Sequence, residues 1–521
     1  MRRDEMIRKI RTRAAENKPW DIAVIGGGAT GMGVAVDAAA RGLDVVLVEA
    51  HDFGKGTSSR STKLVHGGVR YLEQGNVSLV MSALKERGLL RQNAPHLVHD
   101  LAFVVPNYSW WEAPFYGIGL KLYDLLAGKY GFGVSKVLSK EETLALLPAL
   151  EPEELRGGVI YYDGQFDDAR LLIHLAMTAA DHGATLVNYC PAVTVTRDAE
   201  GYVNGLTARD AETGEELAIP ARMVVNATGV FTDEVRRLAD PDAEPLMVTS
   251  QGIHLVFDRS FLKGDTALMV PRTSDGRVLF VIPWHGHAVA GTTDTPVDGP
   301  SLEPRPFEEE IDFILDTAGR YLTRPPSRAD VLAVYVGLRP LVKGEGKTSA
   351  LSRDHTIHVD GSGLLTITGG KWTTYRHMAE DCVDHAITLG KLREEACATR
   401  NLRIHGYLEN AESLGSLEVY GADAQAIQSM ARSDAELAKP LHPELPYIGA
   451  EVVWAARAEM ARTVEDVLAR RTRALFLNAR AAMAMAEPVA RLLSTELGLD
   501  AAWAKGQIID FEMLAAQYTV K

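Results

Sequence analysis

The sequence predicts an α/β fold with an inserted antiparallel sheet and an α-helical C-terminal domain. Three observations indicate this: a strand–helix–strand pattern at 21–49, alternating strands and turns from Gly252 to Thr293, and a change in composition near residue 390. Beyond that point Ala, Leu, Arg and Glu dominate. The chain has 521 residues, more than one hydrophobic core usually supports, so we expect two or three domains.

The first elements form a strand, a helix and a second strand. Asp21 to Ile25 is typical of a short buried strand, and a helix from about Thr30 to Ala40 follows, with Gly42 placed to end it. Val45 to Val48 is a second apolar, β-branched run that closes on Glu49. Elements so close in sequence form a βαβ unit, whose two strands should be parallel.

A glycine motif lies between the first strand and the helix. Gly26, Gly28 and Gly31 have the spacing G-x-G-x-x-G. The first glycine permits a tight turn, the second lets backbone approach a pyrophosphate, and the third lets helix and strand pack closely. The helix N-terminus offers free N–H groups to phosphates, and Glu49 can accept hydrogen bonds from ribose hydroxyls. The motif predicts an adenine-dinucleotide site but does not separate NAD from FAD.

Two later features favour FAD. A Ser/Thr-rich segment follows the unit at once, and its hydroxyls and amides could contact the pyrophosphate and ribityl chain; its members are Thr57, Ser58, Ser59, Ser61 and Thr62. The pair Gly369-Gly370 follows a distant strand and could approach the pyrimidine side of a flavin. Taken alone, the first feature fits a flexible loop equally well, and the second fits an ordinary turn.

The remaining chain alternates helices and strands. Gly54 to Gly68 predicts a loop with short structure, and Gly214 marks a hairpin turn. The expected helices are Val77 to Leu90, Trp110 to Gly133, Ala169 to His182 and one from Thr374. The expected strands are Thr185 to Val195, Tyr202 to Ala208, Met223 to Asn226 and Leu364 to Thr368. Helical spacing in the last part is carried by Val453, Ala456, Met460, Val464 and Val467.

Charge and composition exclude several classes of protein. Hydrophobic residues make up 46% and charged residues 24% of the chain, as in ordinary globular proteins, and the net charge of -14 argues against nucleic acid as the main partner. Cys190, Cys382 and Cys397 have no metal-ligand spacing, so we expect neither a metal site nor a disulfide framework, and a cytoplasmic location fits best. No apolar run is long enough for a spanning helix.

Two segments leave membrane contact open. The basic N-terminus is expected to be a solvated helix or tail, with weak contact to an anionic membrane surface as the alternative. The apolar segment from Trp110 to Gly133 is expected to pack on the substrate domain, with a membrane-facing patch as the alternative.

Several stretches together resemble one known family, the FAD-dependent glycerol-3-phosphate dehydrogenases of the D-amino-acid-oxidase-like flavoproteins. The resemblance runs from about residue 20 to residue 390 and more loosely into the helical end, where it rests on Thr463 to Asn478. The other matching stretches are Ile25-Gly26-Gly27-Gly28, Thr57 to Glu73 (TSSRSTKLVHGGVRYLE), Asn226-Ala227-Thr228-Gly229, Gly291-Thr292-Thr293-Asp294, Gly337-Leu338-Arg339-Pro340 and Gly369 to Arg376 (GGKWTTYR).

The resemblance implies a Rossmann-like FAD-binding domain with an inserted antiparallel-sheet substrate domain, followed by the helical C-terminal domain. The expected division is a basic tail at 1–19, the FAD-binding domain with interleaved substrate domain at 20–390, substrate parts at about 75–150 and 250–335, and the helical domain at 391–521. The implied reaction oxidises sn-glycerol 3-phosphate to dihydroxyacetone phosphate by hydride transfer to FAD. Electrons then pass to a quinone or a similar acceptor. Peripheral attachment to the inner face of the cell membrane and a homodimer stay open.

Carried over position by position, the family's substrate residues fall on Arg70, His254, Arg339, Arg353 and Lys371. Arginine's planar fork suits a phosphate dianion, so Arg70 and Arg353 are candidates for a clamp, with Lys371 nearby. The alternative for these residues is an ordinary surface or salt-bridge role.

Catalysis is expected to involve His254, which could take the hydroxyl proton, and Arg339, which could stabilise the developing alkoxide. A satisfied core histidine is the alternative for His254. Further cofactor contacts are expected from Lys63, Gly229 and Gly370, which lie in the matching stretches, and His66 is expected to be structural or near the flavin.

Three alternatives stay open. The chain could be a glycerol-3-phosphate oxidase that uses molecular oxygen, a related flavin oxidase of amines or 2-hydroxy acids, or a non-catalytic nucleotide-sensing or assembly protein. The absence of an obvious extra insertion in the substrate region favours a dehydrogenase over an oxidase. The converging basic residues favour a phosphorylated substrate.

Overall fold

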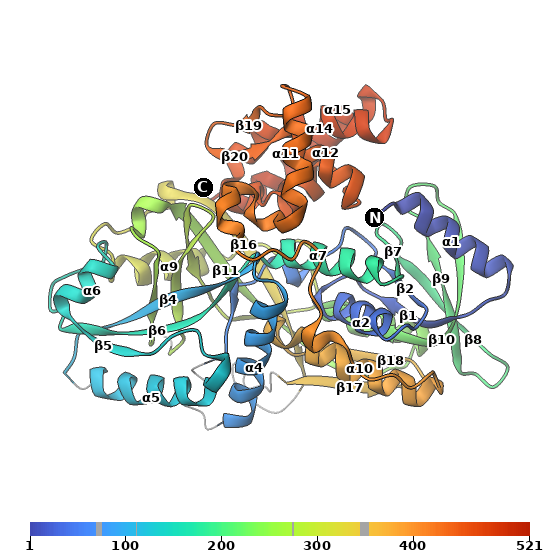
Figure 1. Cartoon of the computed structure of the whole chain (residues 1–521), viewed down its shortest axis with the longest axis horizontal. Coiled ribbons are helices and arrows are strands. Elements are labelled where there is room, and N and C mark those ends of the chain that lie inside the picture. The colour runs from blue at the N-terminus through green and yellow to red at the C-terminus, as the bar shows by residue number, and fades with distance from the viewer. Residues whose placement is uncertain (69–75, 111, 274–275, 344–353) are drawn as a thin grey trace.

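The computed structural model describes residues 1–68, 76–110, 112–273, 276–343 and 354–521. Two sheets lie side by side, and the chain crosses between them several times before it enters a helical C-terminal domain that packs on both (Figure 1). Within these ranges no helix is long and apolar enough to cross a bilayer.

The first sheet contains the βαβ unit. Its strands follow the order β17-β18-β10-β1-β2-β7, and β9 and β8 extend it from β10. β1 pairs in parallel with β2 and with β10, which confirms the parallel unit expected from the sequence. The strands are β1 (Trp20–Ile25), β2 (Val45–Val48), β7 (Thr185–Val187), β8 (Ala192–Arg197), β9 (Val203–Arg209), β10 (Glu216–Asn226), β17 (His355–Val359) and β18 (Leu365–Gly369).

Helices cover both faces of this sheet, which explains its continuous apolar strands. Ile22 and Val24 of β1 face one core, and Ala23 and Ile25 face another. The first core is shared with α2 (Ala29–Ala40), α7 (Asp168–Asp181) and α10 (Tyr375–Gly390), and the second with α1 (Arg3–Ala15). The helix α8 (Thr232–Ala239) follows β10.

The basic N-terminus, expected to be a solvated helix or tail, is a helix that packs on the first sheet and buries two of its arginines. Arg3 is buried and pairs with Asp210 at 2.5 Å, and the guanidinium of Arg13 lies 4.2 Å from the ring centroid of Trp20. The partner of Arg3 is distant in sequence. The partner of Arg13 is an aromatic ring. The charge pattern alone therefore could not reveal that these arginines are used internally.

The second sheet follows the order β15-β11-β14-β13-β12-β4-β6-β3, with β16 paired to β11 and β5 to β6. The antiparallel order of β11, β14 and β13 confirms the expectation for Gly252 to Thr293. Its strands are β3 (Leu64–Val65), β4 (Val98–Asn107), β5 (Lys136–Ser139), β6 (Gly157–Phe166), β11 (Met247–Asp258), β12 (Thr266–Val270), β13 (Leu279–Trp284), β14 (His287–Gly291), β15 (Thr295–Val297) and β16 (Val331–Val342). The sheet thus extends beyond the substrate parts expected at 75–150 and 250–335.

Four helices accompany the second sheet: α4 (Val77–Asn93), α5 (Glu112–Ala127), α6 (Lys140–Leu146) and α9 (Glu308–Gly319). Short 3-10 turns lie between the elements at Thr57–Ser59, Gly128–Tyr130, Gly229–Phe231, Arg259–Phe261, Arg328–Asp330, Trp372–Thr374, Thr399–Asn401, Ala411–Asp423 and Ala516–Tyr518.

The C-terminal domain is mainly helical, as the composition predicts. It contains α11 (Ala424–Ser433), α12 (Gly449–Ala458), α13 (Ala474–Leu477), α14 (Ala479–Leu497), α15 (Ala501–Ala515), the hairpin β19 (Pro440–His442) and β20 (Leu445–Ile448), and a π-helical turn at Asp466–Arg471. Its core is continuous with that of the second sheet, where Tyr335 packs in the same cluster as Phe476.

The residues with helical spacing from Val453 to Val467 are divided among α12, the π-helical turn at Asp466–Arg471 and the segment that joins them. α12 ends at Ala458, and Met460 adopts a left-handed φ of 55°. The carboxylate of Asp466 then accepts hydrogen bonds from the N–H groups of Arg462 and Thr463 and starts a new turn. A capping carboxylate therefore overrides the apolar periodicity.

Candidate active site between the two sheets

A cavity of about 670 Å³ lies where the two sheets meet. On one side it is lined by the carboxyl ends of β1, β2 and β18, and on the other by β11 and β16. Ligands of open parallel sheets bind at this edge, where loops leave the strand ends. The volume is in the ordinary range for a small-molecule or cofactor site.

The glycine turn is sterically required. Gly26 has a φ of 109°, and a Cβ added there would lie 2.7 Å from the carbonyl oxygen of Ala227. A Cβ on Gly31 would lie 2.0 Å from the carbonyl oxygen of Gly26. Gly26 and Gly28 line the cavity, whereas Gly31 lies behind it and acts through packing. This is the division of roles that the motif predicts.

Glu49 has both carboxylate oxygens aimed at backbone donors. Its Oε2 accepts a hydrogen bond from Gly27 N at 2.6 Å, and its Oε1 accepts one from His51 N at 2.9 Å. Burial raises the pKa of this carboxyl, and the two backbone donors oppose the rise. Glu49 also lines the cavity, so its remaining lone pairs can face a ribose.

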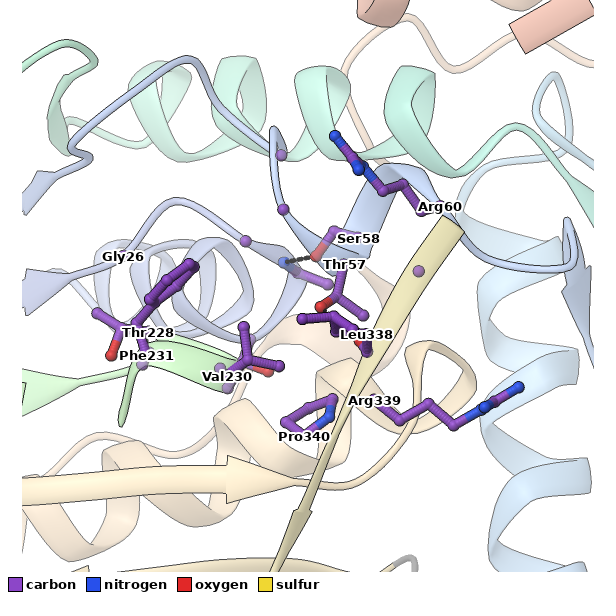
Figure 2. Close-up of a pocket in the computed structure, with 18 of the residues that line it drawn as sticks. Gly26, Thr57, Ser58, Arg60, Thr228, Val230, Phe231, Leu338, Arg339 and Pro340 are labelled. Carbon is purple, nitrogen blue, oxygen red and sulfur yellow. Dashed lines mark hydrogen bonds between the residues drawn. The ribbon is translucent and has the colours of Figure 1, made fainter. Parts of the chain in front are cut away.

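The Ser/Thr-rich segment divides into two groups. Ser58 lines the cavity and its Oγ accepts a hydrogen bond from Ala29 N at 2.9 Å, at the start of α2 (Figure 2). Thr57 lines the cavity too, and donates to Leu338 O at 2.7 Å, which ties the segment to β16. Ser61 and Thr62 complete this group.

Ser59 and Lys63 do not line the cavity, so the structure does not bring them to the expected cofactor site. Ser59 Oγ donates to Gly54 O at 2.6 Å, and Lys63 Nζ donates to Asp168 Oδ2 at 2.7 Å. Lys63 has a left-handed φ of 64°, which turns its side chain out of the direction that simple alternation would give.

His254 lies in the middle of β11, opposite Gly291 of β14 and Tyr335 of β16. It lines the cavity yet is only 3% exposed. Its Nε2 and Thr62 Oγ1 share a hydrogen bond of 2.9 Å, and its Nδ1 has no hydrogen-bond partner among the residues that the structure describes. Burial lowers the pKa of His254 well below its ordinary value, and the charges of Lys63 and Arg339 lower it further. The imidazole is therefore neutral.

Arg339 is on β16, opposite Ser250 of β11, and its guanidinium is held by several acceptors. Nη1 donates to Gln251 O at 3.1 Å and forms an ion pair with Asp294 at 3.2 Å, and Nη2 donates to Thr293 O at 2.7 Å. Leu338, Arg339 and Pro340 line the cavity, and in Figure 2 Leu338 and Pro340 point toward Thr57 and Val230 whereas Arg339 points to the other side of β16. The structure thus brings His254 and Arg339 to one cavity, as expected.

The other expected site residues fall into two sets. Gly229, Gly370, Lys371 and His66 line the cavity; Gly229 and Gly370 both have positive φ, of 59° and 71°. Arg70 and Arg353 lie outside the described residues. The phosphate clamp assigned to that pair therefore stays a prediction.

The sequence interpretation missed several residues of the cavity wall. Arg60 is buried there and pairs with Glu303 at 2.7 Å, and Val230 and Phe231 form an apolar wall after β10. Arg60 lies within the TSSRST stretch, so its position there could have suggested that it contacts the cavity. Phe231 follows the Asn-Ala-Thr-Gly motif, and its position after a strand end could have suggested it.

The cavity fits a flavin dinucleotide: it joins a glycine turn, a helix N-terminus and an acidic strand end to a second wall of polar side chains. Two family profiles match the chain. The one described as "FAD dependent oxidoreductase" matches residues 21–376, and the one described as "C-terminal domain of alpha-glycerophosphate oxidase" matches residues 365–504.

Curated relatives agree with these profiles. A probable mitochondrial glycerol-3-phosphate dehydrogenase of Caenorhabditis elegans is 42% identical over 544 residues, covering 97% of this chain and 75% of the relative. A mitochondrial glycerol-3-phosphate dehydrogenase of Arabidopsis thaliana is 42% identical over 528 residues, covering 93% of this chain and 84% of the relative.

Solved structures show the same fold. The glycerol-3-phosphate dehydrogenase of Bacillus halodurans complexed with FAD is 30% identical and superposes with a TM-score of 0.80, covering 99% of this chain and 97% of that one. The L-alpha-glycerophosphate oxidase of Mycoplasma pneumoniae shares the fold at a TM-score of 0.56 and 18% identity, covering 74% of this chain and 98% of that one.

Proposed function

The chain belongs to the family of FAD-dependent oxidoreductases that includes the glycerol-3-phosphate dehydrogenases, and on this premise we propose that it oxidises sn-glycerol 3-phosphate to dihydroxyacetone phosphate. One observation supports the substrate most: a neutral histidine and a fixed arginine, His254 and Arg339, line the same cavity as the dinucleotide turn. FAD, when bound, supplies the acceptor for the hydride that leaves the secondary carbon.

The cofactor would be held by the backbone of Gly26 and Gly28, by Glu49, and by the hydroxyl groups of Thr57 and Ser58. The side chains of Glu49, Thr57 and Ser58 are already fixed by hydrogen bonds to the surrounding backbone. Such fixed groups bind a ligand without losing further conformational freedom.

His254 would accept the proton of the substrate's secondary hydroxyl. Its neutrality leaves a lone pair for this purpose, but its lowered pKa makes it a weak base in the free protein. A phosphate dianion in the cavity would offset the positive charges of Lys63 and Arg339 and raise that pKa. The phosphorylated substrate would thus help to create its own base.

Arg339 would stabilise the alkoxide that forms as the proton leaves. Its guanidinium is held by Gln251 O and Thr293 O, so it keeps its place while its charge acts on the substrate. Lys371 lines the same cavity and would contact the phosphate, together with Arg70 and Arg353.

The test is anaerobic. The purified protein is loaded with FAD, its visible spectrum is recorded, and glycerol 3-phosphate is added; bleaching of the flavin supports the proposal. An amino acid or a 2-hydroxy acid serves as the competing substrate. If one of these bleaches the flavin and glycerol 3-phosphate does not, the substrate assignment is wrong.

We propose a quinone as the electron acceptor, with molecular oxygen as the alternative. The profile match to the C-terminal domain of an α-glycerophosphate oxidase keeps that alternative in view. The two acceptors are separated by the peroxide formed per substrate oxidised, measured with and without a soluble quinone. One peroxide per substrate in the presence of quinone would identify an oxidase.

An apolar stripe on α5 supports peripheral contact with a membrane. Ile118, Leu122 and Leu125 are 72%, 45% and 76% exposed and share one face of the helix, and Trp110 just before it is 78% exposed. Lys121 is exposed on the same helix and could meet anionic lipid. Two relatives are named mitochondrial, so the cytoplasmic location expected from the sequence stays a prediction.

Co-sedimentation with anionic vesicles tests this contact. The double variant Ile118→Ser/Leu125→Ser should lose binding, because each substitution removes a large exposed apolar group. Met513→Ser is the matched control, since Met513 is 60% exposed but lies on α15, at the opposite end of the molecule (Figure 1). Equal binding of both variants would contradict the role of α5.

A further inference from the structure

Lys63 is completely buried, and burial lowers the pKa of its ammonium group to about 7 against the opposing effect of Asp168. Its Nζ donates to Asp168 Oδ2 at 2.7 Å and to Ser59 O at 2.8 Å. The same Nζ lies 4.8 Å from the ring centroid of Tyr335. A lysine is almost never fully buried unless it is paired, because removing its ammonium group from water is unfavourable. A buried lysine therefore suggests a specific function.

The C-terminal domain reaches the same carboxylate. Arg473 Nη2 donates to Asp168 Oδ1 at 3.0 Å and to Ser59 O at 2.8 Å. Lys63 and Arg473 therefore share two acceptors, although they lie in different domains. Asp168 also accepts hydrogen bonds from the backbone N–H and the hydroxyl of Ser61.

Both cations are held in a left-handed backbone conformation. Lys63 has a φ of 64° and Arg473 a φ of 63°. Residues other than glycine rarely adopt this conformation unless the surroundings impose it. The shared contacts with Asp168 and Ser59 supply that restraint on both segments of the backbone.

The restrained turn contacts His254 directly. Thr62, between Ser61 and Lys63, shares the 2.9 Å hydrogen bond with His254 Nε2. Tyr335 lies against Lys63, stacks on the imidazole, and donates its hydroxyl to Ser61 O at 3.2 Å. Two separate contacts thus connect the buried cluster to His254.

We propose that Lys63, Asp168 and Arg473 form a positioning network by which the C-terminal domain holds Thr62 and Tyr335 against His254. The inference rests on the proposed role of His254 in the reaction. Lys63 and Arg473 are positioning residues, because neither lines the cavity. The helical domain then contributes to the active site without touching the substrate.

The pKa of His254 is a readout that a purely structural role of Lys63 would leave unchanged. Burial lowers the pKa of His254 most, and among the described residues the charges of Lys63 and Arg339 lower it further. Lys63 itself faces Asp168, Arg473 and Asp167. Removing the charge of Lys63 should therefore raise the pKa of His254.

The main variants are Lys63→Met and Arg473→Met, each with a matched control. Arg471→Met is the control for Arg473: Arg471 lies two residues away, is equally buried, and binds Asp52 of the FAD-binding domain at 2.7 and 2.9 Å. The Arg471→Met substitution breaks an interdomain ion pair of the same kind, but this pair has no contact with Thr62, Tyr335 or His254 in the proposed network. Arg473→Lys, which can still reach Asp168, tests for rescue.

The readouts are the flavin content, the melting temperature, kcat and KM for flavin reduction, and the titration of the His254 imidazole by NMR in the flavin-loaded enzyme. The His254 signal is assigned by its loss in His254→Asn. We expect Lys63→Met and Arg473→Met to lower kcat about tenfold with little change in KM, because the base is displaced and not the phosphate site. Arg471→Met should lower only the melting temperature, and Arg473→Lys should recover most of kcat.

Three outcomes would contradict the proposed network or the role of His254 on which it rests. If Lys63→Met and Arg473→Met match Arg471→Met in kcat and in the His254 titration, the network does not position the histidine. If both fail to retain FAD while Arg471→Met retains it, the network is structural and the inference is overturned. If His254→Asn itself turns over normally, the proposed function of His254 fails first, and this result is distinguishable from the other two.

Discussion

Tyr335 lies almost flat against His254, with ring centroids 4.8 Å apart and planes inclined by 12°. The two residues are directly opposite each other on β16 and β11. The stacked tyrosine shields one face of the imidazole, and Thr62 holds its Nε2. His254 is thus a neutral ring fixed in one orientation at the edge of the cavity.

Replacing His254 by Asn should slow flavin reduction by about 10²–10⁴-fold, the usual contribution of a positioned proton acceptor. Asn keeps a polar group in a smaller side chain but cannot take up the proton. Anaerobic stopped-flow measurement of flavin bleaching tests this. Flavin content and binding of dihydroxyacetone phosphate should stay close to those of the unaltered protein, and a normal rate of bleaching would contradict the role of His254.

The pH dependence should follow the lowered pKa of His254. The group must be neutral to accept a proton, so activity falls as the pH drops through its pKa. In the free enzyme that pKa is well below 6.5, so kcat/KM should lose no activity to His254 between about pH 8 and pH 6.5. Bound phosphate should raise the pKa, so the acid limb of kcat should lie at higher pH than that of kcat/KM. Ionisation of the substrate itself is separated by repeating the profile with His254→Asn, where only the substrate effect persists.

The glycine motif makes a steric prediction. Gly31→Ala should yield protein with little or no bound FAD, because the new Cβ would lie 2.0 Å from Gly26 O and push the turn out of place. Gly119→Ala is the control, since a Cβ there meets nothing within 4 Å. The ratio of visible flavin absorbance to protein absorbance measures the effect. Full flavin content in Gly31→Ala would show that the turn can relax.

Local sequence signals were sufficient for the glycine turn and for the antiparallel sheet that carries His254. They rest on short-range geometry: the spacing of Gly26 and Gly31, and the alternation along β11. The left-handed conformation of Lys63 could not be predicted, because its cause is an ion pair with Asp168, which is distant in sequence. The internal use of Arg3 was hidden for the same reason, since its partner is Asp210. The fold and the cavity were therefore predictable, and the charged contacts between residues distant in sequence were not.

The contacts of His405, at a second junction between the domains, should make the free energy of unfolding depend on pH. His405 bridges Asp181 of α7 at 2.6 Å and Asp423, before α11, at 3.0 Å. Burial alone would lower the pKa of His405, but the hydrogen bonds to Asp423 and Asp181 outweigh it and raise the pKa to about 9. Because the folded state holds the proton more tightly than the unfolded state, this stabilisation is complete below about pH 6.5 and is lost as the pH rises through about 9.

His405→Gln should therefore lower the free energy of unfolding by about 1–2 kcal/mol near pH 6, with the difference vanishing near pH 10. Thermal or urea unfolding at the two pH values measures it. His385→Gln, on an exposed side chain of α10, is the control and should change little at either pH. A deficit of the same size at both pH values would mean that the lost contacts, and not the proton, cause the effect.

Glu49→Gln should weaken FAD binding about tenfold or more, because it turns one of two matched hydrogen bonds into a repulsive contact. The carboxylate accepts from Gly27 N on one oxygen and from His51 N on the other, so an amide must point its NH₂ group at one of these N–H donors. The amide can relieve the clash only by rotating away and moving the cavity edge where the ribose would lie. Titration of the flavin-free protein with FAD, followed by fluorescence quenching, gives the dissociation constant. Glu153→Gln, on an exposed loop, is the control. Unchanged FAD affinity in Glu49→Gln would show that the turn accommodates the amide and that FAD binding does not need the Glu49 carboxylate.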